Sequence, residues 1–203
     1  MSFDHFEKRK LMPGQIDWNF NVTFTGDSAV ERMVQDYEPV LNHPDLLHKP
    51  VPAEWLHATV LRLGTTEEIS EVEALAIAEK VQEAVLTLKL PDFRFDSWWL
   101  LFGNVVFHIS PDDQFTKLYE IVKAAMTEVI GKDRASKTPH GRYLAHSTLA
   151  YAKTHDNESQ IHDLMSSSDV KPAKFRAKQM PLIRQYDNDG HYEWEIVKQI
   201  DLP

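Results

Sequence analysis

The chain has 203 residues, 42% of them hydrophobic and 26% charged, which fits one globular domain and excludes a disordered or fibrous protein. It contains no cysteine, so disulfides, thiolate nucleophiles and zinc–thiolate sites are excluded. A formal net charge of −9 disfavours a broad duplex-binding surface, because affinity for nucleic acid comes largely from lysines and arginines that neutralise phosphates.

The first predicted strand covers residues 18–25, where apolar and polar side chains alternate strictly. Its polar face carries Asn19 and Asn21. Residues 26–28 predict a turn and a helix cap, and residues 29–41 repeat apolar side chains at helical spacing. The chain is therefore expected to begin with a strand followed by a helix.

The next segment, residues 43–52, is rich in proline and predicts a loop. A strand is expected at residues 55–64, followed by a long helix over residues 65–88 whose first turns are acidic, as the helix dipole favours. Two more strands are predicted at residues 93–101 and 104–109, on either side of a glycine-containing turn.

A similar order follows in the second half. Residues 110–130 predict a helix and residues 132–141 a polar loop. A strand at residues 142–151 and a shorter helix at residues 158–165 come next.

The chain ends in a predicted hairpin, with strands at residues 173–186 and 191–200. Strand, helix, histidine-bearing strand and helix thus occur twice, without a flexible linker between the two series. The pattern predicts a single α+β domain over residues 1–203, built from two similar lobes, each a mostly antiparallel sheet with helices outside.

Each histidine-bearing strand carries the pattern H-x-T: His57 and Thr59 lie in the first, within residues 57–60, and His146 and Thr148 in the second, within residues 146–149. Residues i and i+2 of a strand face the same way, so each histidine projects together with its threonine. The motif in isolation is weak, and its recurrence in matching contexts, one per lobe, gives it weight.

Two such pairs suit the hydrolysis of a phosphodiester. Imidazole titrates near neutral pH, so one histidine can act as general base while the other acts as general acid. The threonine hydroxyls would bind the non-bridging phosphate oxygens. The structural alternative is that both histidines are hydrogen-bonded residues of the core; His108 and Ser110 also fit H-x-[ST], yet Ser110 is expected to be a turn or helix cap.

With paired H-x-[ST]-x motifs, the chain resembles the 2H phosphoesterase superfamily, within its 2'-5' RNA ligase-like branch. Residues 55–60 resemble the first motif, residues 144–151 the second, and residues 182–194 the closing hairpin of bacterial members. The resemblance implies a bilobal, pseudo-twofold fold with a central cleft and metal-free chemistry on 2',3'-cyclic or 2',5'-linked phosphates. By position it implies that His57 and His146 are catalytic and that Thr59 and Thr148 bind phosphate.

Several other residues are candidates for binding the substrate. Asn19 and Asn21 could bind a base or ribose, or could lie on a solvated edge strand. Arg142 adjoins the second motif and belongs to a locally basic loop, which is either a phosphate-binding patch or a solvated segment. Arg62 and Lys153, located five and seven residues after the motif histidines, are weaker candidates.

The aromatic side chains near the motifs have two interpretations. Strand alternation turns Tyr151 away from His146, which predicts a core residue. Trp98, Trp99 and Phe102 are either core residues or a wall on which a base stacks.

No cofactor and no metal are expected, since the sequence has neither a phosphate-binding glycine loop nor a spaced set of metal ligands. The expected partner is a small nucleotide or an RNA terminus, not duplex nucleic acid and not a membrane, and the protein is expected to be a monomer. No apolar signal-peptide core precedes the domain, so a cytoplasmic location is expected.

Two alternatives to a hydrolase stay open at this point. The chain could bind a nucleotide or RNA end with little turnover, or it could be an unrelated α+β protein in which the twin motifs are coincidental. RNA 2'-5' ligation would be the reverse reaction in the same site.

Overall fold

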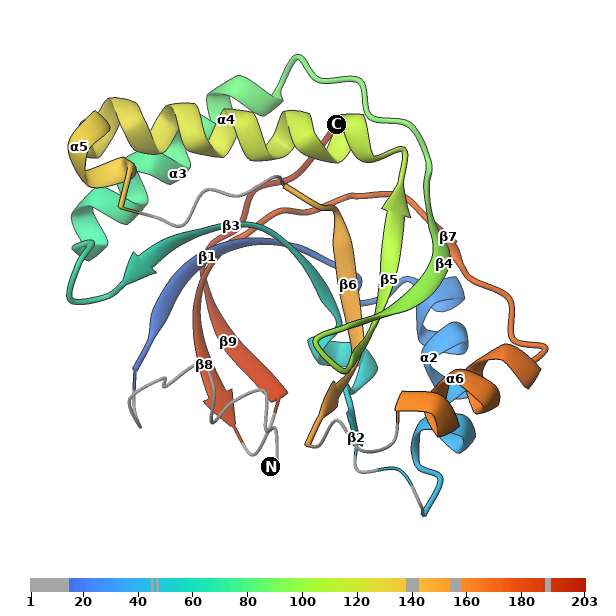
Figure 1. The fold of residues 1–203 in the computed structure, drawn as a ribbon. Coiled ribbons are helices and arrows are strands. Elements are labelled where there is room, and N and C mark those ends of the chain that lie inside the picture. Colours follow the sequence, from blue (N-terminus) through green and yellow to red (C-terminus); the bar gives the residue numbers. More distant parts are fainter. Residues whose placement is uncertain (1–14, 45, 47, 138–142, 154–157, 189–190) are drawn as a thin grey trace.

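The computed structural model describes residues 15–44, 46, 48–137, 143–153, 158–188 and 191–203. Within these residues the chain forms two antiparallel β-sheets with α-helices outside them (Figure 1), which confirms the predicted fold class. The strands are β1 (Asp17–Thr23), β2 (His48–Pro50), β3 (His57–Thr65), β4 (Phe93–Leu101), β5 (Asn104–Ser110), β6 (His146–Ala152), β7 (Lys174–Phe175), β8 (Leu182–Asn188) and β9 (His191–Lys198). The helices are α2 (Ser28–Leu41), α3 (Glu71–Val85), α4 (Asp112–Ile130), α5 (Lys132–Ala135), α6 (Glu158–Ser167) and the 3-10 turn η1 (Ala53–Trp55).

The two sheets place the motif strands in different layers. The four-stranded sheet has the order β3-β1-β8-β9, and the five-stranded sheet has the order β2-β6-β5-β4-β7. His57 and Thr59 therefore belong to the four-stranded sheet, whereas His146 and Thr148 belong to the five-stranded sheet.

Different helices cover the two sheets, apart from α4, which contacts a strand of each. Helices α3 and α4 pack on each other and contact β8 and β3 of the four-stranded sheet. Helix α2 contacts α6 and the strands β2 and β7 of the five-stranded sheet (Figure 1). This arrangement leaves the opposing faces of the sheets free to form a site.

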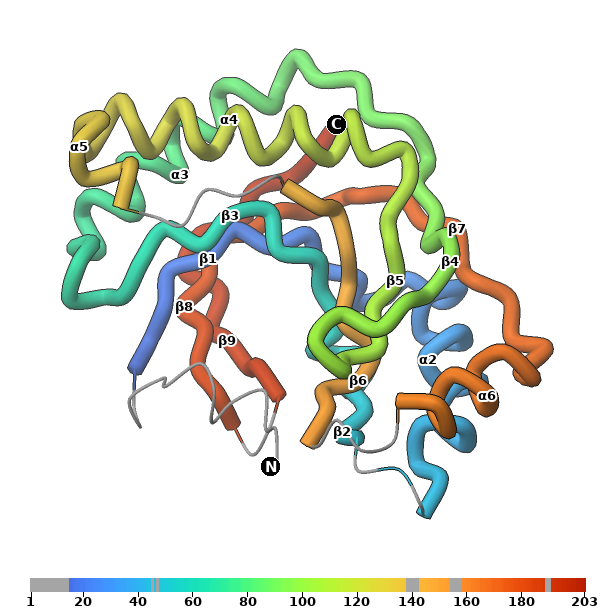
Figure 2. Tube along the Cα trace, viewed as in Figure 1, coloured from blue at the N-terminus to red at the C-terminus, as the bar shows by residue number. Residues whose placement is uncertain are grey.

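Neither sheet is built from one half of the chain. The C-terminal hairpin β8–β9 pairs with β1, near the start of the described chain, and β2 pairs with β6 (Figure 2). The strand predicted at residues 173–186 is divided: β7 pairs with β4 in one sheet, and β8 pairs with β1 in the other. The chain thus crosses between the sheets after β7.

The apolar side chains that alternate along β1 are buried in the core, as the sequence pattern predicts. Trp18, Phe20 and Val22 are all buried, and the Trp18 indole N–H donates a hydrogen bond to the carbonyl of Ile69 at 2.8 Å. Burying these side chains stabilises the fold by about 2 kcal/mol each. The four-stranded sheet is thereby fixed on its helix-covered side, and the polar residues of β1 face the other way.

Helix α3 begins later than the sequence pattern predicts. Ser70 caps the helix by accepting from the backbone N–H of Glu73, whose carboxylate accepts from the N–H of Ser70 in return. This capping box starts the helix at Glu71. Within the described residues, no helix has the length and apolar character that crossing a membrane requires.

Candidate active site

A cavity of about 430 Å³ lies between the two sheets, a volume within the range of small-molecule sites. Both motif histidines and both motif threonines line it, together with residues from β1, β3, β4, β5, β6, β8, β9 and the β4–β5 turn. The lining residues are Asp17, Asn19, His57, Thr59, Arg62, Leu101, Phe102, Asn104, Val106, His146, Thr148, Tyr151, Gln185 and Tyr192. The two H-x-T patterns, 89 residues apart in the chain, therefore meet at one site.

The two histidines are held by the same kind of hydrogen bond. His57 Nδ1 lies 2.8 Å from the carbonyl oxygen of Trp55, and His146 Nδ1 lies 2.8 Å from the carbonyl oxygen of Leu144. A carbonyl only accepts, so each Nδ1 carries the hydrogen and donates it. In each neutral ring, Nε2 is then the basic nitrogen.

Hydrogen bonds between the motif strands tie the two halves of the site together. Ser147, between the second histidine and its threonine, is buried and donates from Oγ to the carbonyl oxygen of His57 at 2.7 Å. The Tyr143 hydroxyl donates to the carbonyl oxygen of Thr59 at 3.0 Å. Burial raises the pKa of the Tyr143 phenol far above its usual range, so this donor keeps its proton. The backbone of the first motif is thus held by two side chains in or next to the second motif.

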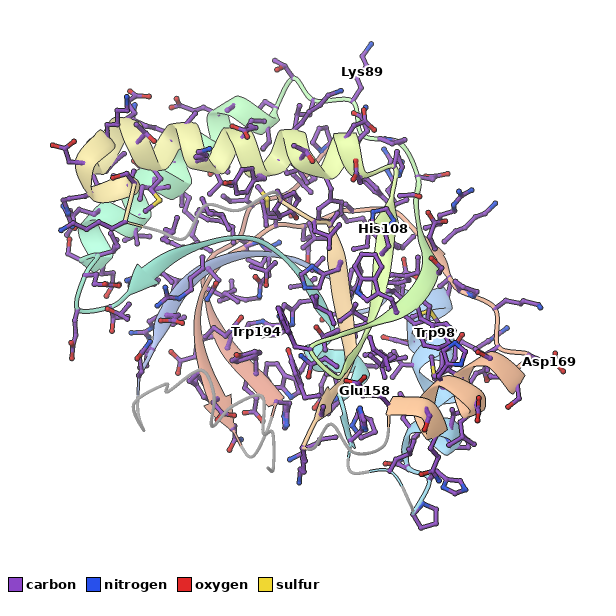
Figure 3. All side chains as sticks on the ribbon, in the orientation of Figure 1. Lys89, Trp98, His108, Glu158, Asp169 and Trp194 are labelled. Carbon is purple, nitrogen blue, oxygen red and sulfur yellow. The ribbon has the colours of Figure 1, made fainter. Side chains whose placement is uncertain are left out.

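The C-terminal hairpin supplies an aromatic wall beside His57. The Trp194 and Tyr192 rings of β9 lie edge-on to the imidazole, with centroid distances of 5.0 and 6.4 Å, and Tyr192 also contacts Tyr151 at 5.6 Å. Figure 3 shows Trp194 on β9, within the curve of the four-stranded sheet. Sequence reasoning missed Tyr192 because only the folded hairpin brings it to the motif.

Next to the motif residues, the four-stranded sheet presents a polar surface. Arg62 donates from Nε and Nη2 to the two carboxylate oxygens of Asp17, both at 2.8 Å. The hydrogen bond to Asp17 raises the pKa of the Arg62 guanidinium. Asn19 and Gln185 complete this surface, and within the described residues Asn19 Nδ2 is buried without a hydrogen-bond partner.

Of the predicted binding residues, Asn21 does not line the cavity. Arg142 falls outside the described residues. Asn21 is fully buried and does not line the cavity; it lies beneath the lining, because its amide donates to the side-chain oxygen of Gln185 at 3.1 Å. Its part in the site is to hold Gln185, whereas Asn19 reaches the cavity itself.

The remaining candidates also differ in whether they line the cavity. Arg134 lies in the segment predicted as a polar loop, within the short helix α5, and binds Glu73 and the carbonyl of Glu68, so it ties α5 to α3. Trp98, which Figure 3 shows beside α6, packs against His162 of that helix, and Trp99 stacks on His108 at 5.9 Å. Of the three aromatic candidates, Phe102 lines the cavity, and Trp98 and Trp99 do not.

Arg62 and Tyr151 line the cavity because the strands that carry them contain register shifts. The alternation of polar and apolar residues in the sequence does not show such shifts. The pairing of β1 with β3 shifts between Phe20 and Asn21, and the pairing of β5 with β6 shifts between Val105 and Val106. Each shift adds one residue after the motif threonine, which reverses the faces of the strand beyond it. Arg62 and Tyr151, each five residues after a motif histidine, thereby line the cavity. Tyr151 is buried as predicted, but it faces the site.

The potential metal ligands of the described chain are dispersed: no group of three or more histidine, aspartate or glutamate side chains is gathered closely enough there to hold a metal ion.

Comparison with known proteins gives a consistent family and fold. Residues 26–189 match the model of the 2'-5' RNA ligase superfamily. The fold is similar to that of TT0787 of Thermus thermophilus, with a TM-score of 0.68 at 18% identity over 93% of this chain and 97% of that one. It is also similar to E. coli LigT complexed with 3'-AMP, with a TM-score of 0.60 at 13% identity over 93% and 98% of the chains. A protein described as a phosphoesterase gives 0.62 at 12% identity, again over 93% and 98%. No curated protein matches the sequence.

Proposed function

Because the chain belongs to the 2'-5' RNA ligase superfamily, a family of 2H phosphoesterases, we propose that it is a metal-independent phosphodiesterase. Its substrate is a 2',3'-cyclic or 2',5'-linked phosphodiester of a nucleotide or RNA end. One observation carries this proposal: two histidines from different sheets line one cavity, each with Nδ1 bound to a carbonyl and each accompanied by a threonine.

The reaction requires two proton transfers around one phosphorus atom. Nε2 of one neutral histidine takes a proton from the attacking water, whose oxygen forms the new bond to phosphorus. Nε2–H of the other, protonated histidine gives its proton to the leaving ribose oxygen as the old P–O bond breaks. The products are a phosphomonoester and a free hydroxyl, and exchange of protons with solvent restores both rings.

The surroundings of the phosphate would favour the transition state. Thr59 and Thr148 donate from their hydroxyls to the non-bridging oxygens, where negative charge builds up. The backbone carbonyls that accept from Nδ1 keep both rings oriented before the substrate arrives, which reduces the entropic part of the barrier. RNA 2'-5' ligation is the same pathway in reverse.

The proposed substrate size follows from charge and cavity volume. A net charge of −9 opposes a long polyanion, whereas a cavity of about 430 Å³ suits one nucleotide or one RNA terminus. The binding of 3'-AMP by E. coli LigT, a protein of the same fold, supports a nucleotide ligand. We propose that the protein acts as a monomer, since one chain supplies both of the H-x-T pairs that the proposed reaction needs.

Turnover in the presence of EDTA tests this proposal. The substrates are 2',3'-cyclic nucleotides, 2',5'-linked dinucleotides and, for comparison, 3',5'-linked dinucleotides. We expect hydrolysis of a member of the first two groups at a rate that EDTA does not change. Loss of that activity in EDTA would contradict the metal-independent mechanism. Tight binding of the same compounds with no turnover would instead indicate a nucleotide-binding module.

A further inference from the structure

The turn between β4 and β5 is strained, and it forms part of the cavity wall. Leu101 and Asn104 pair across the turn, and the two residues between them have positive φ angles, 52° for Phe102 and 82° for Gly103. This left-handed region is disfavoured for a residue with a Cβ, so Phe102 adds strain that Gly103 does not. Leu101, Phe102 and Asn104 all line the cavity that contains the two motif histidines. A change in the position of this turn would therefore change the shape of the site.

Two side-chain hydrogen bonds tether the turn to neighbouring strands. The side-chain oxygen of Asn104 accepts from the backbone N–H of Ala152 in β6 at 2.9 Å. On the other side, His48 Nε2 of β2 lies 2.9 Å from the carbonyl oxygen of Gly103. A carbonyl only accepts, so the His48 ring carries its hydrogen on Nε2 and donates it. Since β2 pairs with β6, His48 links the turn to the edge of the five-stranded sheet.

The other nitrogen of the His48 ring is buried without a partner. Nδ1 has no hydrogen-bond partner among the residues that the structure describes. In the neutral ring with its hydrogen on Nε2, Nδ1 presents only a lone pair there. Protonation would put a hydrogen and a positive charge at this nitrogen. A buried donor and a buried charge are both costly when they are unpaired, so the position suits the neutral ring.

The charged groups around His48 do little to offset that cost. His48 lines a groove between β2 and α2 together with Lys49, Lys153 and Glu38. The two lysines would oppose a further positive charge, and Glu38 is exposed on α2. β6 places an alanine opposite His48, and the turn at residues 101–104 carries no charged side chain. Protonation of the ring would therefore meet little compensation from its neighbours.

The pH dependence follows from the two environments of the ring. While the turn is tethered, burial lowers the pKa of His48 below its ordinary value of 6.5, and the hydrogen bond to Gly103 raises it by less. With the turn released, the ring is solvated and takes up a proton near its ordinary pKa. The released state then binds more protons than the tethered state, so a fall in pH below about 6.5 favours release. Above that pH the tether contributes its full stabilisation.

We propose that His48 is a positioning residue for the site and acts as a pH-sensitive tether. The neutral ring holds the β4–β5 turn at the cavity, and protonation of the ring releases the turn and with it one wall of the cavity. The strain at Phe102 favours movement of the turn once the tether is lost. The effect on turnover rests on the function proposed above, whereas release of the turn is a property of the fold alone.

Hydrogen exchange of the turn tests the tether without any substrate. The measurement is the protection factor of residues 101–105, corrected for the intrinsic pH dependence of amide exchange, at pH 7.5 and pH 5.5. In the wild type we expect protection to fall about fivefold or more at the lower pH, because release gains up to about tenfold per pH unit while only the released ring is protonated. In H48Q, glutamine Nε2 can still donate to Gly103 and does not titrate, so protection should be equal at both pH values. H48A lacks the donor and should show low protection at both.

Kinetics of the proposed reaction test the consequence for the site. Between pH 7.5 and pH 5.5, KM for the preferred cyclic phosphate should rise more in the wild type than in H48Q. The pH dependence of kcat should be the same in both proteins, because the motif histidines are unchanged. H162Q replaces an exposed histidine of α6 and should match the wild type in exchange and in kinetics. Equal changes of KM in the wild type and H48Q would overturn the positioning role.

Failure of the hydrolase proposal is distinguishable from failure of the tether. If the wild type hydrolyses none of the substrates, the exchange measurement still decides whether His48 holds the turn. Equal protection of the turn at both pH values in the wild type, or a loss at pH 5.5 that H48Q shares, would overturn the tether and leave the proposed hydrolysis intact.

Discussion

The two cavity histidines are alike at the level of single atoms. Each donates from Nδ1 to the carbonyl of the residue two positions earlier, and each projects beside a threonine two positions later. A fixed tautomer matters because acid–base catalysis requires the same nitrogen to face the reacting oxygen in every turnover. In the mechanism we propose, the H-x-T spacing in a strand therefore places the proton carrier and the phosphate-binding hydroxyl on one face.

Replacing either motif threonine with valine should lower kcat while preserving the fold. Valine keeps the shape of the side chain and removes the hydroxyl, so T59V and T148V each lose one donor to the transition-state oxygens. We expect kcat to fall by about 10²-fold in each case, measured on the preferred cyclic phosphate. T25V changes an exposed threonine just after β1 and serves as the control. A kcat within twofold of the wild type in both motif variants would rule out phosphate binding by these hydroxyls.

Ser147 offers a test of the link between the two motifs. S147A removes the donor to the His57 carbonyl, which is a buried hydrogen bond of 2.7 Å. We expect a loss of about 1 kcal/mol in the free energy of unfolding in urea, and a reduced kcat because His57 is less well positioned. S167A, which removes an exposed hydroxyl at the end of α6, should change the stability by less than about 0.5 kcal/mol. Equal stability of S147A and wild type would show that the link is not stabilising.

At the level of elements, regular strands and helices could be predicted, and departures from regularity could not. The alternation in β1 and the apolar spacing in α2 and α4 predict those elements close to their observed bounds. The same alternation assigns Tyr151 to the face opposite His146, because it assumes no extra residue in the strand. The inserted residues depend on pairing with neighbouring strands, which is long-range information. The sequence did hold one sign that Arg62 and Tyr151 occupy equivalent places in the site, because each lies five residues after a motif histidine.

The start of α3 should depend on pH through Glu73. Hydrogen bonds from Arg134 and Ser70 lower the pKa of this carboxyl from 4.5 to about 2. A carboxyl with a lower pKa in the folded state stabilises the protein fully above pH 4.5, and this contribution is lost as the pH falls from 4.5 towards 2. Because 29% of the Glu73 side chain and 43% of the Arg134 side chain remain exposed, solvent screens the pair and the effect is modest.

The variant E73Q isolates that contribution. Glutamine can still accept in the capping box but does not titrate, so the urea midpoint of E73Q should fall less between pH 5 and pH 2.5 than that of the wild type. E71Q removes an exposed carboxylate from the same helical turn and should keep the wild-type dependence on pH. Parallel curves for E73Q and the wild type would show that Glu73 does not stabilise the fold through its charge.

At the scale of the whole molecule, the site depends on two sheets that each draw on both halves of the sequence. β2 completes the sheet that carries His146, and β8–β9 completes the sheet that carries His57. The strand pairings that join the two halves of the sequence could not be predicted. β2 has three residues and β7 has two, which is too short for an alternating pattern, and each is a strand only because it pairs with a neighbour. The two H-x-T motifs could be predicted because the same pattern occurs twice in the sequence, each time within a predicted strand. The cavity residues from the C-terminal hairpin became identifiable only in three dimensions.

The central claim, that His57 and His146 act as one acid–base pair, is tested most directly by kcat for H57A, H146A and the double variant, in EDTA, on the preferred cyclic phosphate. H162A, an exposed histidine on α6, serves as the control. We predict that each single variant loses about 10³-fold in kcat while staying folded, and that the double variant loses little more, because the two rings act as a unit. Wild-type turnover by either folded single variant would contradict the two-histidine mechanism.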